Sequence, residues 1–571
     1  MCIRDRVCLT RADGTSIQME YDLDDHMVSL RTPDGVDWQQ AYNGQGLLVS
    51  QTDPLGATTR FDYDAQGQLQ AQTNARHAVT QLRYDRHGLV AAVIDALGHQ
   101  SRFEHDPLGN LLRQVDPLGQ VSRYEYDAKG RLLATAGPDG NGVRCEYDAE
   151  DQLLRYTDEA GAQTRLQYVG IGQISKRLQA DGHSVEYRYD TEEQLIAVIN
   201  QRGETYQLVR DALGRIVEEV DYWGQSRRYT YDAAGRLTAT VDPLGQRIAF
   251  TTDKLGRITR KTLPDVRHPG QQVQEHFVYD VQGQIVELRN PVRTVKRRYD
   301  PLGQLLEELQ DGFRVGYAYD EVGNRVLRET AAGNRLAFGY DLRDQTVSVA
   351  INDEPPISME RDALGRTTRE QLSPQLQREF TYDSRNLLTS QSVLKDAAPL
   401  FETRYDYDRS GNLTKRSDSA QGVDEYRYDA IGRLLQHIDP KGRVERYFND
   451  PAGDRLRTEV KQVQARKVVG GDDDDLTTWT REGTYQGVHY VFDRAGDLVR
   501  KGAPQGDAPD DLTLIWDANH RLAESRRNGQ STYYGYDPLG RRVFKRNPTQ
   551  TTWFFWDGCL LYTSDAADDM Q

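Results

Sequence analysis

Carboxylates and imidazoles are the side chains of this sequence that could run acid–base reactions. The chain contains 88 Asp and Glu residues and 11 His residues. Nearly all of the Asp residues stand at the first position of a turn-like motif, where a carboxylate accepts hydrogen bonds from nearby backbone N–H groups. We therefore interpret these carboxylates as turn caps, and the sequence predicts no catalytic residue among them.

No metal or cofactor site is predicted. His77, His99 and His105 lie at or beside turns, and none of the histidines forms a metal-ligand pair with Cys or a nucleophile–base arrangement. The acidic run at residues 470–475 falls in the longest break of the repeat described below, which predicts a solvated loop. Calcium binding is the alternative for this run, but it lacks the Asp-x-Asp-x-Asp-Gly spacing of a calcium loop.

The elements that carry these residues recur every 21 residues. Stepping by 21 from Tyr21 to Thr252 gives Tyr at nine of twelve positions. The next residue is Asp at ten of these positions, and the residue four positions on is Gly at nine. A period this regular is a property of the fold and indicates an array of similar units.

Each unit contains two turns. The first is Tyr-Asp-x-x-Gly, in which Asp caps the backbone and Gly accepts the positive φ of a type I hairpin turn with a glycine bulge. The second turn begins eleven residues after the position that Tyr usually occupies in the 21-residue period, which we call the register position. It often reads Asp-Pro-Leu-Gly, where Pro presets the backbone angle. The residues predicted to build representative turns are Tyr63, Asp64, Gly67, Tyr84, Asp85, Gly88, Tyr126, Asp127, Gly130, Tyr231, Asp232, Gly235, Tyr428, Asp429 and Gly432 for the first kind, and Asp53, Pro54, Gly56, Asp116, Pro117, Gly119, Asp242, Pro243 and Gly245 for the second.

Short strands are predicted between the turns. Leu237, Ala239 and Val241 alternate with polar residues, and a period of two is typical of β-strands. Counting the looser copies after Thr252 gives 25 units, which predicts roughly 50 strands. Because twisted open sheets seldom exceed about ten strands without curling, such a sheet must wrap. We predict an all-β fold of tandem β-hairpins that form a large curved or spiralling antiparallel sheet.

A β-propeller is the alternative architecture. Two 21-residue units would make a blade of ordinary length, but 25 units would give about twelve blades, more than the usual four to eight. The odd and even units do not differ, and the Trp-Asp pair occurs only at Trp516 and Trp556. The pattern therefore favours the continuous sheet.

Charge and hydropathy exclude some partners. The net charge of −16 disfavours nucleic acid and anionic lipid, which are bound mainly through basic patches. No apolar run approaches the roughly 20 residues that span a bilayer. The sequence thus predicts neither a nucleic-acid partner nor a membrane span.

The two ends of the chain differ from the rest. Residues 1–6 and 559–571 resemble translations of a transposon-based sequencing adapter read on opposite strands, so we interpret residues 7–558 as an internal fragment of a longer protein. Within it we expect a repeat shell at 7–460, a loop insertion with the acidic run at 461–485, and further repeats at 486–558. Cys8 and Cys145 are then the remaining cysteines and are expected to be unpaired, with a single bridge as the alternative.

The repeated motif resembles a known family. Tyr-Asp-x-x-Gly occurs in ten strict copies between Tyr63 and Tyr536, accompanied by Asp-Pro-Leu-Gly and by Gly-Arg-Leu at residues 130–132, 235–237 and 432–434. This combination resembles the YD repeat of bacterial Rhs proteins, toxin-complex C subunits and animal teneurins. The resemblance implies a hollow β-cocoon around a variable C-terminal polypeptide, commonly a toxin, that is cut from the shell and delivered to another cell, often by a type VI secretion system. The family's Asp-Pro-x-Gly-Leu cleavage hallmark is absent, so no family catalytic residue transfers to this chain.

The resemblance implies a non-enzymatic container. Its expected partner is its own C-terminal toxin domain, with secretion-adaptor or spike proteins as further partners, and no cofactor is expected. The expected location is the bacterial cytoplasm before export as a secreted or delivered effector. The alternative is a cell-surface adhesion protein of the teneurin or wall-associated kind that binds protein or glycan, with the tyrosine ladder as a sugar-stacking surface; cross-strand packing is the simpler interpretation of that ladder.

Overall fold

The computed structural model describes residues 7–455, 458–464, 477–503, 508, 510–558 and 560–565. Every regular element in these residues is a β-strand, and none is a helix. Strands β1 to β42 form one antiparallel sheet, and β43 to β52 form a second one. The predicted all-β fold of tandem hairpins is therefore confirmed, with 52 strands.

The strands are short and similar in length throughout the chain. Their bounds in the first part are β1 (Cys8–Thr10), β2 (Ser16–Tyr21), β3 (Met27–Arg31), β4 (Asp37–Tyr42), β5 (Leu48–Thr52), β6 (Thr58–Tyr63), β7 (Leu69–Thr73), β8 (Val79–Tyr84), β9 (Val90–Ile94), β10 (Gln100–His105), β11 (Leu111–Val115), β12 (Val121–Tyr126), β13 (Leu132–Ala136), β14 (Arg144–Tyr147), β15 (Leu153–Thr157), β16 (Gln163–Val169), β17 (Gln173–Leu178), β18 (Ser184–Tyr189), β19 (Leu195–Ile199), β20 (Thr205–Arg210), β21 (Ile216–Val220), β22 (Ser226–Tyr231), β23 (Leu237–Val241) and β24 (Arg247–Thr252).

The sheet then continues with β25 (Ile258–Pro264), β26 (Gln272–Tyr279), β27 (Ile285–Arg289), β28 (Thr294–Tyr299), β29 (Leu305–Gln310), β30 (Phe313–Tyr319), β31 (Arg325–Thr330), β32 (Arg335–Tyr340), β33 (Thr346–Ile351), β34 (Ile357–Arg361), β35 (Thr367–Ser373), β36 (Leu376–Tyr382), β37 (Leu388–Lys395), β38 (Ala398–Tyr407), β39 (Leu413–Asp418), β40 (Gly422–Tyr428), β41 (Leu434–Ile438) and β42 (Val444–Arg446). The second sheet comprises β43 (Thr458–Gln464), β44 (Thr477–Tyr485), β45 (Val488–Phe492), β46 (Leu498–Gly502), β47 (Leu512–Trp516), β48 (Leu522–Arg527), β49 (Gln530–Tyr536), β50 (Arg542–Arg546), β51 (Thr551–Asp557) and β52 (Leu560–Asp565).

One repeat shows how the sequence dictates the hairpin. Strands β6 and β7 are joined by the turn that begins at Asp64, where the Gly67 N–H donates to the Asp64 carbonyl at 3.1 Å and Gly67 has a φ of 83°. The register of the β6–β7 ladder shifts beside Tyr63, which marks a bulge. Glycine suits this position because it adopts positive φ without the steric cost that other residues carry.

Substitution of one turn glycine measures this requirement. Gly235 has a φ of 80°, and a Cβ there would meet only the Arg215 side chain at an ordinary 3.8 Å, so conformation and not crowding decides the outcome. We expect Gly235→Val to destabilise the hairpin by about 1 kcal/mol or more. The measurement is amide hydrogen exchange of β22 and β23. Gly44→Val is the control, because Gly44 does not have a positive φ and a Cβ there would meet no atom within 4 Å; equal effects of the two substitutions would contradict the assigned turn.

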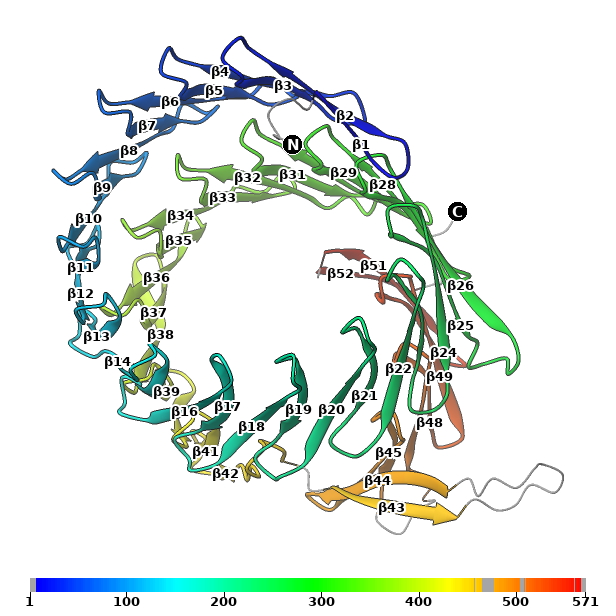
Figure 1. The fold of residues 1–571 in the computed structure, drawn as a ribbon. Coiled ribbons are helices and arrows are strands. Elements are labelled where there is room, and N and C mark those ends of the chain that lie inside the picture. The colour runs from blue at the N-terminus through cyan, green and yellow to red at the C-terminus, as the bar shows by residue number, and fades with distance from the viewer. Residues whose placement is uncertain are drawn as a thin grey trace.

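The sheet winds into a spiral. Figure 1 shows the wall curling round a central opening, and the chain passes the same side of the ring first as β1–β9 and again as β28–β35. Side-chain hydrogen bonds join residues 248 to 270 positions apart along this path. One circuit therefore takes about 250 residues, or about twelve repeats. We call the line along which successive circuits meet the seam.

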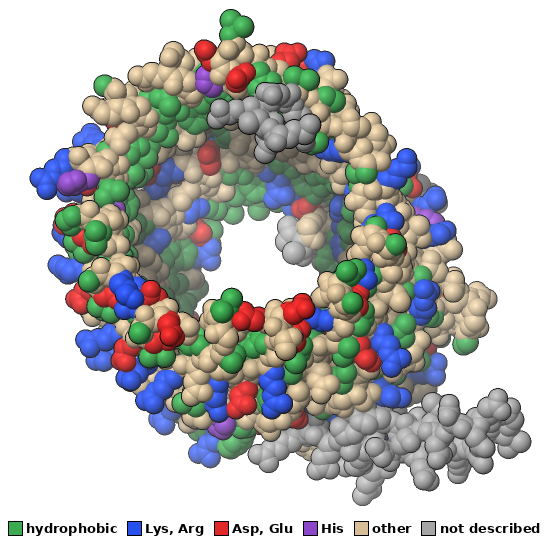
Figure 2. Space-filling view, in the orientation of Figure 1, with side chains coloured by type: hydrophobic (Ala, Val, Ile, Leu, Met, Phe, Trp, Pro, Cys, Tyr) green, Lys and Arg blue, Asp and Glu red, His purple; other side chains and the backbone are tan. Residues whose placement is uncertain are grey.

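The two faces of the wall differ in chemistry. Within β6, Arg60 and Asp62 are exposed, whereas Phe61 and Tyr63 are half-buried on the opposite face. Figure 2 shows many hydrophobic side chains on the inner wall of the ring, and Lys, Arg, Asp and Glu side chains over its outer surface. The alternation along each strand thus places the apolar face toward the opening.

The core is concentrated where the last strands lie against the second circuit. The fully buried side chains include Leu288, Val295, Val315 and Val543 together with the polar residues Gln310, Glu275 and Asp537. A single-layer sheet buries little elsewhere, since only one face of each strand is partly covered. The stability of most of the wall therefore depends on contacts between neighbouring repeats.

The predicted loop at 461–485 is corrected in part. Residues 461–464 belong to β43 and residues 477–485 to β44, and these two strands pair in antiparallel register. The Thr- and Val-containing alternation of these segments favours strands, so the hairpin extends beyond the point where the 21-residue register is lost. The acidic run at 470–475 lies outside the described residues, as do residues 1–6, 559 and 566–571 of the predicted adapter segments. Residues 560–565 form β52, which pairs with β51.

Candidate functional site: the turn lattice and the seam

The tyrosines at the register positions link neighbouring repeats of the wall. The Tyr63 hydroxyl donates to the Leu48 carbonyl at 2.8 Å, which ties one repeat to the one before it. Burial raises the pKa of Tyr168 and Tyr189, which keeps these hydroxyls protonated as donors. The same bond to a carbonyl fifteen residues earlier is made by Tyr42, Tyr63, Tyr84, Tyr147, Tyr168, Tyr189, Tyr231, Tyr340, Tyr382 and Tyr428.

The turn carboxylates accept backbone hydrogen bonds. Asp64 Oδ1 accepts from the N–H groups of Gln66 and Gln68, both at 2.9 Å. Hydrogen bonds from the backbone hold the pKa of Asp85 and of Asp232 below its usual range, so these groups stay ionised. The same double cap is made by the first-kind turn residues Asp85, Asp127, Asp232 and Asp429 and by the second-kind turn residues Asp53, Asp116 and Asp242.

An arginine after the turn glycine joins successive repeats. Arg131 Nε donates to Asp127 Oδ2 at 2.6 Å, its Nη1 donates to the Asp148 carbonyl at 3.0 Å, and its guanidinium lies 4.8 Å from the centre of the Tyr147 ring. The sequence analysis assigned no role to this arginine, although its recurrence in the Gly-Arg-Leu motif indicated that the position matters to the repeat. The same stacking on the next register tyrosine recurs at Arg215, Arg257, Arg366 and Arg521.

Lysine should not replace this arginine. Arg366 Nε donates to Asp362 at 2.7 Å and its guanidinium stacks 4.6 Å from the Tyr382 ring centre, and a lysine has neither the planar fork nor the stacking face. We expect Arg366→Lys to lower the free energy of local opening by about 1 kcal/mol. Amide exchange of β35 and β36 measures it. Arg404→Lys is the control, because Arg404 is exposed and pairs with nearby Glu402. An equal response of the two variants would contradict the role assigned to Arg366.

The seam is built from side chains of two rows of turns. Among the described residues each backbone ladder joins strands that are consecutive in the chain, as in the pairs β1–β2, β2–β3 and β41–β42, and none joins one circuit to the next. Second-kind turns of the earlier circuit instead meet first-kind turns of the later one. The ion pairs that cross it include Arg76–Asp344 at 2.9 Å, Arg343–Asp95 at 3.4 Å, Arg385–Asp139 at 3.4 Å, Arg433–Asp181 at 3.3 Å and Arg202–Asp450 at 2.7 Å.

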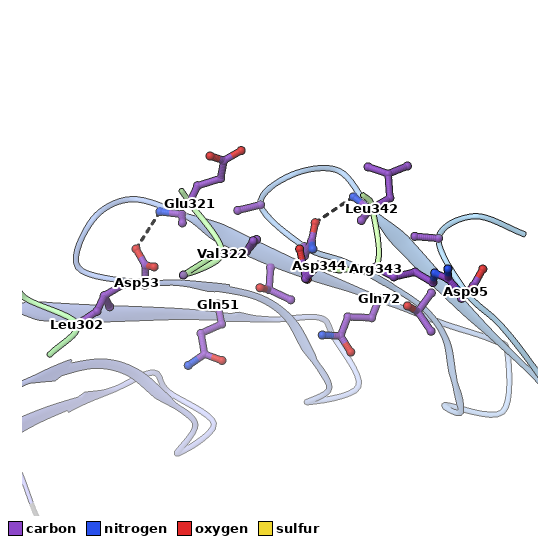
Figure 3. Close-up of a pocket in the computed structure, with 18 of the residues that line it drawn as sticks. Gln51, Asp53, Gln72, Asp95, Leu302, Glu321, Val322, Leu342, Arg343 and Asp344 are labelled. Carbon is purple, nitrogen blue, oxygen red and sulfur yellow. Dashed lines mark hydrogen bonds and ion pairs between the residues drawn. The ribbon is translucent and has the colours of Figure 1, made fainter. Parts of the chain in front are cut away.

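A cleft of about 840 Å³ interrupts the first part of the seam. Figure 3 shows Gln51, Asp53 and Gln72 from the earlier circuit facing Leu302 and Val322 from the later one. The Asp53 carboxylate is occupied by its own turn, where it accepts from Leu55 and Ala57 at 2.9 Å. The cleft is therefore a gap between two rows of turns and not a convergent reactive site.

The last strands are fixed to the second circuit by a buried charge network. Glu308 accepts from Arg297 Nε at 2.8 Å and from Arg541 Nη1, across the seam, at 2.7 Å. Arg541 also donates to Asp537 at 2.7 Å, and Asp537 is fully buried. Each charge is thus matched by an opposite one, which is the arrangement that buried ions require.

A second buried cluster lies beside this network. The Tyr317 hydroxyl donates to Asp557, and burial together with this carboxylate raises the tyrosine pKa. Asp557 also pairs with Arg328, whose side chain is 4% exposed. Tyr317 is therefore a permanent donor at physiological pH, and the cluster serves to hold β51 against β30 and β31.

One hydroxyl–imidazole–carboxylate chain differs from the sequence prediction. His489 Nδ1 lies 3.3 Å from Thr484 Oγ1, and its Nε2 lies 2.8 Å from Glu482. Thr484 and His489 face each other directly in the β44–β45 ladder, so register produces the contact. His489 is buried at 9% exposure, whereas Thr484 at the hydroxyl end of the chain is exposed. The sequence did not indicate this arrangement, because it arises from the pairing of two strands, and we interpret it as a cross-strand link.

Within the residues that the structure describes, no group of three or more His, Cys, Asp and Glu side chains is placed to hold a metal ion. None of the described segments is a helix capable of spanning a membrane. Cys8 and Cys145 are unpaired. The chemistry of the described residues is that of a cross-linked wall.

Comparison with known families agrees with this geometry. The model of the teneurin YD-shell matches residues 37–228 and 267–470, and the model of the RHS repeat matches residues 210–247. The chain is 29% identical over 296 residues to the probable deoxyribonuclease RhsB of Dickeya dadantii, covering 48% of this chain and 20% of that protein. It is 25% identical over 310 residues to the double-stranded DNA deaminase toxin A of Burkholderia cenocepacia, covering 47% of this chain and 20% of that protein.

A solved structure has the same fold. The crystal structure of TcdB2-TccC3 superposes with a TM-score of 0.66 at 14% identity, covering 98% of this chain and 38% of that one. The chain thus spans about a fifth of the length of the curated relatives it matches.

Proposed function

The chain belongs to the teneurin YD-shell family, and on that premise we propose that it is the encapsulating wall of an Rhs-type toxin, which sequesters and delivers a C-terminal effector. The observation that carries the proposal is a wall of consecutive hairpins, in two sheets, that curls round an opening and turns its apolar face inward (Figure 2). The polar groups described above form turn caps, arginine contacts between repeats and ion pairs at the seam, which supports a structural role for the wall.

The names of the relatives support a division of labour. One is named as a deoxyribonuclease and another as a DNA deaminase toxin, and the match to this chain covers 20% of each. Two different chemistries attached to one repeated wall point to an activity that lies outside the repeats. We propose that the wall itself is non-enzymatic and that the effector follows it in the full-length protein.

The inner face suggests how the effector is held. Half-buried aromatic residues lie on this face in many repeats, such as Phe61 and Tyr63 in β6 and Tyr229 and Tyr231 in β22. Apolar surface of this extent binds partly unfolded polypeptide through the hydrophobic effect. Confinement would therefore keep the effector inactive until release, with secretion-adaptor or spike proteins carrying the loaded shell out of the bacterial cytoplasm.

The proposed domain organisation follows from the same assignment. We assign residues 7–460 and 486–558 to the repeat wall and treat 461–485, whose described residues belong to the paired strands β43 and β44, as an insertion between them. Residues 1–6 and 559–571 remain assigned to sequencing adapters. Sequencing through both junctions tests this assignment, and the recovery of the same residues from the uninterrupted gene would refute it.

Protease protection tests the container. The full-length protein is treated with a protease, and the digestion of its C-terminal effector is compared with that of the same effector expressed alone. We expect the effector inside the wall to survive protease concentrations that digest the free one. A fusion that carries the effector before β1, outside the wall, is the control. Equal digestion of the enclosed and free effector would refute encapsulation.

A further inference from the structure

His520 occupies a distinctive place on the seam. It lies in the turn between β47 and β48, and its Nε2 is 3.1 Å from Arg227 Nη2 on β22 of the earlier circuit. Its Nδ1 is 2.8 Å from Asp497 Oδ2, which belongs to the neighbouring repeat of its own circuit. The imidazole therefore connects a contact within one circuit to a contact between circuits.

The hydrogen bond to Arg227 determines which protonation state His520 has when the seam is closed. A guanidinium only donates hydrogen bonds and stays charged, so the Nε2 that faces it must accept. His520 is then neutral, with its proton on Nδ1 and donated to Asp497. A proton added to Nε2 would set two donors and two positive charges against each other.

We propose that His520 is a pH-operated latch, in which protonation of Nε2 breaks the bond to Arg227 and loosens the seam here while each circuit stays folded. The inference concerns the wall and does not depend on what the wall encloses.

The direction of the effect follows from linkage. The hydrogen bond to Asp497 raises the pKa of His520, whereas burial and the Arg227 charge oppose that rise. Separation of the circuits removes much of the burial and the Arg227 charge, which both lower this pKa, and also the Asp242 charge, which raises it but has a smaller effect than either. The pKa of the imidazole is therefore higher in the separated state. The separated state then binds the proton more tightly, and lowering the pH through the histidine range favours separation.

The folding of the later circuit responds in the opposite sense. Because the folded-state pKa of His520 is raised, the contribution of this group to folding is fully present below its unfolded pKa and is lost as the pH rises through the folded value. Acidification thus strengthens the His520–Asp497 link between repeats while it weakens the seam. Opening without unfolding is the consequence.

Two buried carboxylates near the latch act against it. Burial raises the pKa of Asp242 on the earlier circuit and of Asp493 on the later one, so their protonation as the pH falls favours the closed seam. Burial lowers the pKa of Lys261, whose ammonium lies 3.6 Å from Glu275. The charged and titratable groups that surround His520 are Arg227 and Asp242 from the earlier circuit, Asp493, Arg494 and Asp497 from the preceding repeat, Asp517 and Arg521 from its own turn, and Lys261 and Glu275 beside that turn.

Amide hydrogen exchange of the full chain between pH 8 and pH 6, corrected for the intrinsic pH dependence, measures the latch. We expect exchange at the seam turns 221–225 and 493–497 to rise about fivefold as the pH falls, the factor that the loss of one hydrogen bond gives. His520→Gln should abolish the rise, because glutamine can accept from Arg227 and donate to Asp497 at every pH. His26→Gln is the matched control, since His26 pairs with Asp22 at 3.2 Å within its own turn, on a single circuit.

A second variant tests the latch independently, in case His520→Gln does not fold. Arg227→Gln places an amide opposite His520 that can donate to the neutral ring or accept from the protonated one, so it too should make exchange independent of pH. A pH dependence that persists in both folded variants, or a wild-type seam whose exchange does not change, would overturn the latch.

Discussion

Glu308→Gln is expected to release the last strands from the second circuit. The side chain of Glu308 is 6% exposed and pairs with Arg297 on its own sheet and with Arg541 across the seam. A glutamine of the same shape leaves the half-buried Arg297 without this countercharge and leaves Arg541 with Asp537 alone. Because removing one partner of a buried ion pair leaves an uncompensated charge, we expect the free energy of opening of β49–β51 to fall by about 3 kcal/mol.

The measurement is amide exchange of β49 to β51 in the full chain. Glu104→Gln is the matched control, because Glu104 also pairs with an arginine, Arg113, but on the exposed face of the wall. Exposed pairs contribute little, so this control should leave exchange almost unchanged. Equal and small effects of the two substitutions would show that the buried network does not fix the last strands.

Gly142→Ala is expected to disrupt the turn between β13 and β14. A Cβ at Gly142 would overlap the backbone carbonyl of Thr135, and a backbone atom cannot move aside as a flexible side chain does. The turn also contributes Asp139 to the seam, where it pairs with Arg385 at 3.4 Å. We therefore expect a loss of about 2 to 3 kcal/mol in the local free energy of opening, with loosening of the seam at Arg385.

Exchange of the amides in β13, β14 and residues 383–386 measures both effects. Gly44→Ala is the control, because its Cβ would meet nothing within 4 Å and its backbone needs no positive φ. Alanine there should be neutral or slightly stabilising, since it reduces the freedom of the unfolded chain. A Gly142→Ala protein as stable as the control would show that the turn has room that the structure does not indicate.

The hairpin array could be predicted from the sequence because its determinants are local. The carboxylate of Asp64 and the amides that it caps lie within five residues, and Gly67 takes its positive φ in the same turn. The alternation of Phe61 and Tyr63 with Arg60 and Asp62 fixes the two faces of the strand. Each of these features is complete within a single repeat, so a periodic sequence displays it many times.

The seam could not be predicted, because its partners depend on curvature summed over about twelve repeats. Nothing in one repeat tells that Arg343 will meet Asp95, or that His520 will meet Arg227. The resemblance implied a spiral without its pitch, and the pitch decides which turns face each other. The role of Arg131 and its equivalents was missed for a simpler reason, since its three partners lie on two successive turns and a strand.

The extended hairpin of β43 and β44 shows a further limit. Its strands continue past the end of the 21-residue register, and the loss of that register was interpreted as a loop. Period and strand propensity are separate signals, and propensity persists where the period ends. A break in the repeat therefore does not mean a loss of strands, and here it marks the passage from the first sheet to the second.

Electron cryomicroscopy of the full-length protein tests the container most directly. The account predicts ordered or diffuse polypeptide density inside the opening that β1 to β52 surround, with the effector connected to the wall at its C-terminal end. An opening filled only with solvent, with the effector folded outside the ring, would contradict it.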